Sequence, residues 1–111
     1  MEITQKKADQ VCIVTPHVSK IDASVAVEFR KKMLELVEKG ENRLVLNLEE
    51  VEFIDSSGLG ALVSVLKKAG PDGVIKLFAV KDAVRSIFEL TRLDRVFAIH
   101  ISEEGAVESM R

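Results

Sequence analysis

Hydrophobic positions after residue 43 alternate between short continuous runs and segments with a helical period. The continuous runs have the length of β-strands, and the periodic segments place apolar side chains three and four residues apart. In chain order, the predicted elements are a strand at 43–48, a short run at 51–54, a helix at 57–69, a strand at 74–80, a helix capped by Asp82, a strand at 96–101 and a short terminal helix after Ser102. Strands separated by helices are typical of crossover units with parallel strands.

The first forty residues predict a hairpin followed by a longer helix. Ile3–Lys7 and Val11–Thr15 are β-prone runs separated by a short polar stretch, and Pro16 is expected to end the second strand because it lacks a backbone donor. The helix is expected to begin after Asp22 as its N-cap and to end before Gly40. Its apolar side chains share one face, and they are Val25, Phe29, Met33, Leu36 and Val37.

These elements predict an α/β fold with a mixed β-sheet of about four to five strands, opened by a short antiparallel pair, with helices packed against it. The chain has 111 residues, close to the usual size of one domain. No repeat, low-complexity tract or linker-like stretch marks a boundary. We therefore expect a single domain over residues 1–111.

Composition narrows the range of functions. Hydrophobic residues make up 47% and charged residues 31%, which suits a folded domain rather than a disordered tail. The 16 basic and 18 acidic side chains are interspersed and give a net charge of -2. Binding to DNA or RNA needs a stripe of positive charge that displaces counterions from phosphates, so direct nucleic-acid binding is disfavoured.

Neither a membrane location nor an oxidising one is indicated. A membrane-spanning helix needs roughly 20 apolar residues in a row, and the apolar runs here are far shorter. The initial sequence MEITQKKADQ lacks the apolar region of a signal peptide. Cys12 is the only cysteine and lies in an apolar run, so we expect a buried, inert thiol and a cytoplasmic protein.

The most informative segment is Phe53–Gly60, where a strand passes into a helix. The first turn of a helix has backbone N–H groups without partners, and Asp55 or Ser56 can satisfy one of them. One interpretation is a helix cap followed by glycines used for close packing. The other is a phosphate or partner site, because Gly58 and Gly60 would leave the positive end of the helix bare.

The sequence VEFIDSSGLGALVSVLKK, residues 51–68, resembles the phosphorylation-site segment of anti-sigma factor antagonists, bacterial members of the STAS domain family. Lys20–Ala23, Phe29–Arg30 and Leu44–Leu48 resemble the family's first helix entry and the strand before the site, and Val80–Phe97 resembles its third helix and next strand. Two departures lie in loops: Val18–Lys20 lacks a glycine that the family often has, and Arg92 stands in a stretch that often contains one.

The resemblance implies a single STAS domain that switches partners. The unmodified protein would bind an anti-sigma factor that is also a serine kinase and so release a sigma factor. The kinase would then phosphorylate Ser56, and a metal-dependent serine phosphatase would reverse the modification. By position, the residues implied in partner binding are Asp22, Asp55, Ser57, Gly58, Leu59 and Gly60. Within the same family, the alternative is a module of a stress-sensing or lipid-transport complex that does not act on a sigma factor.

Other classes of function find little support. The chain has no G-x-S-x-G, and its only histidines are His17, expected in a loop, and His100, expected in a strand. Together with Cys12 they show no metal-ligand spacing, so no metal site and no catalytic residue is predicted. Gly58 and Gly60 begin a G-x-G-x-x-G, but Val63 occupies the third glycine position, so no nucleotide or other cofactor is expected. We therefore predict a binding protein rather than an enzyme.

Overall fold

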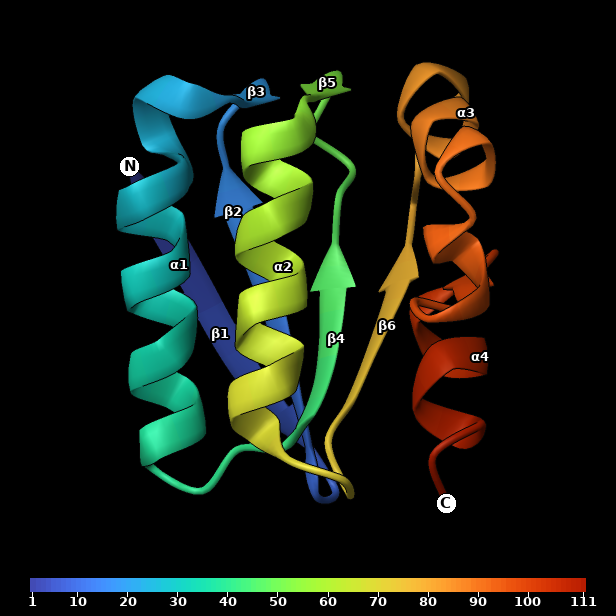
Figure 1. The fold of residues 1–111 in the computed structure, drawn as a ribbon. Helices are drawn as coiled ribbons and strands as arrows, with labels where there is room; N and C mark the ends of the chain where they lie inside the picture. The colour runs from blue at the N-terminus through green and yellow to red at the C-terminus, as the bar shows by residue number, and fades with distance from the viewer.

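The computed structural model describes the whole chain, residues 1–111 (Figure 1). Its main sheet has the strand order β1-β2-β4-β6-β7, with β1 at Glu2–Ala8, β2 at Val11–His17, β4 at Arg43–Asn47, β6 at Val74–Phe78 and β7 at Ile99–His100. β1 pairs antiparallel with β2, and the other neighbours pair in parallel. The predicted α/β class, with a mixed sheet opened by an antiparallel pair, is confirmed.

Three helices pack against one face of this sheet, and one short helix packs against the other. The helices are α1 (Ala23–Glu38), α2 (Ser56–Ala69), α3 (Asp82–Leu90) and α4 (Glu103–Glu108), with a 3-10 helix η1 at Leu93–Arg95. Buried residues of α1, α2 and α3 share one core with Leu44 and Leu46, whereas α4 packs over Val45 on the opposite face. β4 is therefore buried on both sides, as its continuous apolar sequence predicts.

A second sheet of two short parallel strands lies where α1 and α2 begin (Figure 1). β3 (Lys20–Ile21) pairs with β5 (Phe53–Ile54), and Ile21 is the register partner of Ile54. The apolar run at 51–54 therefore contributes to this small sheet and not to the main one. Both isoleucines are fully buried, which anchors the two helix starts to the core.

Two expectations about β2 are wrong. The strand continues through Pro16, which is the register partner of Ile3, and it ends at His17. β4 pairs with β2 only from Cys12 to Val14, so the missing N–H of Pro16 interrupts no hydrogen bond to β4. His17 consequently lies in a strand and not in a loop.

The third helix and the strands on either side of it also differ from prediction. Lys81, not Asp82, is the N-cap of α3, and no side chain caps this helix; Asp82 is its first residue. β6 ends at Phe78 because Ala79 adopts a φ of 57°. In the predicted strand 96–101 only Ile99 and His100 pair with β6.

Arg92 lies in one of the two loops where the sequence lacks an expected glycine. It has a φ of 61°, in the left-handed region that costs residues other than glycine about 1–2 kcal/mol. The following turn of η1 brings Phe97 into the core, where its ring meets Phe88 edge-on at 6.1 Å between centroids. The turn that shortens the predicted strand therefore serves to bury an aromatic ring.

Candidate functional site

Two helix N-termini lie side by side at one end of the molecule (Figure 1). Asp22 directly follows β3 and Asp55 directly follows β5, so the pairing of Ile21 with Ile54 brings the two aspartates into equivalent positions. The backbone N–H of Asp55 donates to the carbonyl oxygen of Ile21 at 3.3 Å. The site is thus assembled from segments more than thirty residues apart in the chain.

Asp55 is the cap of α2, as one of the two alternatives predicted. Its Oδ1 accepts hydrogen bonds from the backbone N–H groups of Ser57 at 2.9 Å and Gly58 at 3.1 Å. These are two of the donors that a helix start leaves without internal partners. The Asp55 side chain therefore satisfies these two backbone N–H groups, and neither serine hydroxyl is used.

Asp22 caps α1 in a different way. Its Oδ1 accepts from the backbone N–H of Ser24 at 3.0 Å and also from the Ser24 hydroxyl. The hydroxyl bond, followed by the backbone bond, lowers the pKa of the Asp22 carboxyl because both favour its charged form. Asp22 is consequently an ionised, half-exposed carboxylate beside the second helix start.

Ser56 and Ser57 occupy the first two positions of α2, and both are exposed. Neither hydroxyl takes part in a hydrogen bond, in contrast to the hydroxyl of Ser24. Ser56 is therefore accessible to another molecule, at the positive end of a 14-residue helix.

The two glycines of the motif have different surroundings. Gly58 is buried, and a Cβ at this position would lie 2.4 Å from the carbonyl oxygen of Ile21. The expectation that Gly58 leaves the helix start bare is therefore wrong, because its missing side chain allows β3 to pack against α2. At Gly60 a Cβ would meet nothing within 4 Å, and the residue is exposed. Leu59 points into the core and is 6% exposed.

Phe53 also lies at this end of the molecule, and it was not among the residues predicted from the sequence. It is 42% exposed, although its neighbour Ile54 is fully buried. Successive side chains of a strand lie on opposite sides, so β5 buries Ile54 and leaves Phe53 exposed. Glu52 and Lys81, which lie 4.0 Å apart, add an exposed ion pair near the same end.

The side chains considered for catalysis or metal binding lie elsewhere. His17 is held between Thr4 at 2.8 Å and Glu50 at 2.7 Å, and His100 lies in β7. Burial is the main reason that the pKa of His100 is lowered and that of the Cys12 thiol is raised. No group of three His, Cys, Asp or Glu residues is placed to hold a metal ion.

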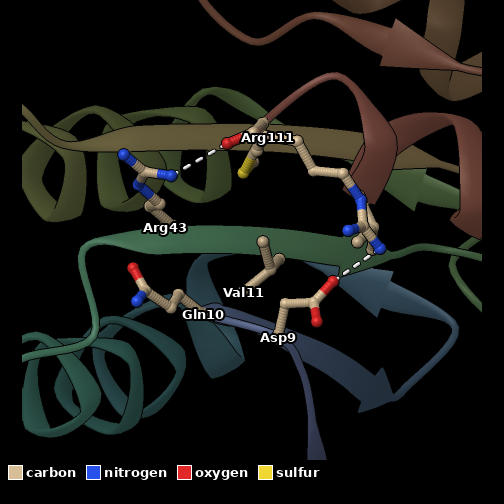
Figure 2. Close-up of a pocket in the computed structure, with 7 residues that line it drawn as sticks. Asp9, Gln10, Val11, Arg43 and Arg111 are labelled. Carbon is tan, nitrogen blue, oxygen red and sulfur yellow. Dashed lines mark hydrogen bonds and ion pairs between the residues drawn. The ribbon is translucent and has the colours of Figure 1, made fainter.

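A pocket of about 330 Å³ opens near the β1–β2 turn and the C-terminal residues (Figure 2). Arg111 pairs with Asp9 at 2.6 Å, and Arg43 donates to the carbonyl oxygen of Met110 at 2.8 Å. The pocket also contains Gln10 and Val11. Its arginines are occupied by contacts within the chain, and these contacts tie the hairpin and β4 to the residues after α4.

The geometry defines a class: a small α/β binding domain that presents a free serine hydroxyl at a capped helix start. The sequence profile of the STAS domain family matches residues 2–106. The chain belongs to the STAS domain family, in the group of anti-sigma factor antagonists, which are regulatory binding proteins rather than enzymes.

Individual relatives agree with this assignment. A Thermotoga maritima protein named as an anti-sigma factor antagonist is 33% identical over 108 residues, covering 96% of this chain and 95% of its own. The crystal structure of such a T. maritima protein superposes with a TM-score of 0.87 at 32% identity, covering 96% and 92% of the two chains. The anti-sigma-B factor antagonist of Bacillus subtilis is 33% identical over 91 residues, covering 79% and 81%.

More distant structures share the fold. The anti-sigma factor antagonist SpoIIAA, in its unphosphorylated form and in the phosphorylated form from Bacillus, gives TM-scores of 0.73 and 0.72 at 18% identity. Each match covers 99% of this chain and 98% or 100% of the other.

None of the four helices combines the length and the apolar character needed to cross a lipid bilayer.

Proposed function

We propose that the unphosphorylated chain binds an anti-sigma factor serine kinase in the cytoplasm and thereby releases a sigma factor. Phosphorylation of Ser56 by that kinase ends the interaction, and a metal-dependent serine phosphatase restores it. The observation that carries this proposal is the Ser56 hydroxyl, which is exposed and free of hydrogen bonds beside a cap that Asp55 supplies. The names of the relatives support an anti-sigma factor as the partner.

The fold is expected to tolerate the phosphate. A phosphoserine carries roughly -1.5 to -2 charges and three acceptor oxygens. At the first position of α2 this charge faces the electropositive end of the helix, which offsets repulsion from the neighbouring Asp55. No hydrogen bond within the chain has to break, because the Ser56 hydroxyl makes none. SpoIIAA, which keeps one fold in both forms, supports this expectation.

The complex with the kinase is expected not to tolerate a phosphate on Ser56. A partner fitted against Ser56 would have to accommodate the added volume, strip the phosphate of water and place it beside its own charges. Unfavourable charge placement in a buried interface typically costs several kcal/mol. The same modification therefore leaves the domain folded and separates the two proteins.

The test is phosphorylation by each anti-sigma factor serine kinase encoded in the same genome, purified and supplied with ATP. Fragment mass spectrometry should place one phosphate on Ser56. Ser56→Ala should accept none and remain bound to the kinase, whereas the matched variant Ser57→Ala should still be modified on Ser56. Genuinely phosphorylated protein should bind at least a hundredfold more weakly than unmodified protein, with an unchanged circular dichroism spectrum. Equal binding of the two forms would remove the proposed switch, and so would modification confined to Ser57.

A further inference from the structure

Lys76 is a half-buried cation in the middle of the main sheet, and no carboxylate neutralises it. It is the central residue of β6, and its register partner Val45 is fully buried. Its ammonium group forms no ion pair and donates one hydrogen bond, to the hydroxyl of Ser109 at 2.6 Å. Charges withdrawn from water are usually paired with an opposite charge, so the stability of the fold does not account for this lysine.

Two further basic groups lie beside Ser109. The Nε2 atom of His100, in β7, is 3.5 Å from the Ser109 Oγ, and burial, followed by the charge of Lys76, lowers the pKa of its ring. Arg43 of β4 donates to the carbonyl oxygen of Met110 at 2.8 Å (Figure 2). This bond holds the guanidinium in place but does not neutralise it, because Arg43 forms no ion pair. We call these four side chains the basic cluster: Lys76, His100, Ser109 and Arg43.

A pocket of about 230 Å³ opens beside the basic cluster, and all its members except His100 line it. The acidic side chain of the lining is Asp72, which is exposed and forms no ion pair. Arg111 also lines the pocket, but its guanidinium is already bound to two carboxylates. The pocket therefore keeps an excess of positive charge even when Arg111 is left out.

The basic cluster suits a phosphate group better than a carboxylate. Its members come from β4, β6, β7 and the residues after α4, so they reach the pocket from different directions. A phosphate carries up to two charges and three acceptor oxygens arranged as a tetrahedron, whereas a carboxylate carries one charge and accepts in a single plane. The Lys76 ammonium already holds one oxygen acceptor at 2.6 Å, the Ser109 hydroxyl, and a phosphate oxygen can take that position.

A second pocket indicates what the phosphate is attached to. The pocket of about 330 Å³ in Figure 2 shares Arg43 and Met110 with the first one. Its apolar walls include Val11 and Val107, and Gln10 adds an amide that can donate and accept hydrogen bonds. Such a lining suits a short carbon chain that carries hydroxyl groups.

We propose that the basic cluster binds the phosphate group of a small phosphomonoester, such as a phosphorylated polyol, whose organic part lies in the second pocket. Lys76 then exchanges its bond to Ser109 for a bond to the phosphate. The site lies on the face of the sheet that α4 covers, away from α1 and α2, so it goes beyond the proposed function and does not depend on it. A bound ligand connects β4 and β6 with the residues after α4 and stabilises the fold.

Titration calorimetry at constant ionic strength compares glycerol 3-phosphate, inorganic phosphate and glycerol. Glycerol 3-phosphate should bind saturably and more tightly than inorganic phosphate, and glycerol should not bind. Lys76→Gln should weaken the binding of glycerol 3-phosphate by about tenfold and Arg43→Gln by about threefold, because each removes a charged donor. Lys31→Gln, an equal loss of charge on the exposed side of α1, is the matched control and should bind like wild type. Circular dichroism checks that each variant is folded.

His100 supplies a second readout. Bound phosphate should raise the pKa of its ring, because a neighbouring anion favours the protonated imidazolium, and NMR titration of the ring protons measures this change. Lack of saturable binding at millimolar ligand, or equal weakening by Lys76→Gln and Lys31→Gln, would overturn the site. An unchanged His100 titration in the presence of saturating ligand would also overturn it. Inorganic phosphate that binds as tightly as glycerol 3-phosphate would overturn the assignment of an ester and leave free phosphate as the ligand.

Discussion

The starts of α1 and α2 are built alike and differ in what they leave free. Each helix follows a buried isoleucine of the small sheet and is capped by an aspartate, Asp22 or Asp55. In α1 the serine two residues after the cap uses its hydroxyl to bind that aspartate. In α2 both serines keep their hydroxyls free, because Asp55 is satisfied by two backbone N–H groups.

This difference separates the requirements of folding from those of function. At the start of α1, the Ser24 hydroxyl is hydrogen-bonded within the chain. At the start of α2, Asp55 accepts from two backbone N–H groups, and two serine hydroxyls remain exposed to solvent. An exposed hydroxyl without a hydrogen bond is therefore available on α2, whereas the Ser24 hydroxyl on α1 is bonded to a carboxylate. The largest difference in packing lies one position further along, where Gly58 on α2 corresponds to Val25 on α1.

The largest effect is expected for Gly58→Ala. Its Cβ would lie 2.4 Å from the carbonyl oxygen of Ile21 and 2.7 Å from Cγ1 of Ile54, so the small sheet has to move away from α2. Such overpacking should lower the free energy of unfolding by about 2–3 kcal/mol. The equivalent change on α1, Val25→Ala, removes a partly buried side chain and should cost about 1 kcal/mol. Urea denaturation followed by circular dichroism measures both, and equal losses would show that the contact with Ile21 is not what requires glycine.

Sequence reasoning predicted these helix starts because their signals are local. An aspartate before a helical apolar pattern marks a cap, and both Asp22 and Asp55 act as one. The same reasoning was wrong at Asp82, since an acidic residue at the first helical position gives the same pattern without a side-chain hydrogen bond. Local pattern therefore finds a helix start more reliably than it identifies the capping residue.

Features that depend on distant segments were not predictable in this way. β3 and β5 have two residues each, too short for a pattern, and only their pairing brings Asp22 beside Asp55. The different roles of Gly58 and Gly60 likewise depend on Ile21, far away in sequence.

A smaller effect is expected from removing the caps themselves. Asp55→Ala leaves two backbone N–H groups without their acceptor and should cost about 1–2 kcal/mol of unfolding free energy. Asp22→Ala loses one backbone bond and should cost about 1 kcal/mol or less. Thermal denaturation at neutral pH compares them. A larger loss at Asp22 would mean that its bond to the Ser24 hydroxyl contributes more than a second backbone bond does at Asp55.

The smallest effect concerns the pKa of Asp22 and the stability of the fold at low pH. Because the pKa of Asp22 is lowered in the folded protein, its carboxylate stabilises the fold above the ordinary pKa of 3.8, and this contribution is lost as the pH falls through the lowered value. The Ser24 hydroxyl is the main cause, so Ser24→Ala should raise the pKa of Asp22 toward 3.8, with the remaining backbone bond keeping it somewhat lower. NMR titration of the Asp22 carboxyl carbon measures this shift directly.

The difference in melting temperature between Ser24→Ala and wild type should narrow from pH 6 to pH 3, since protonation weakens the bond that the variant lacks. Ser57→Ala is the control at the equivalent position of α2 and should show no such pH dependence, because its hydroxyl binds no carboxylate. An unchanged Asp22 titration in Ser24→Ala would mean that the hydroxyl does not bind the cap in solution, and the two helix starts would then be equally open.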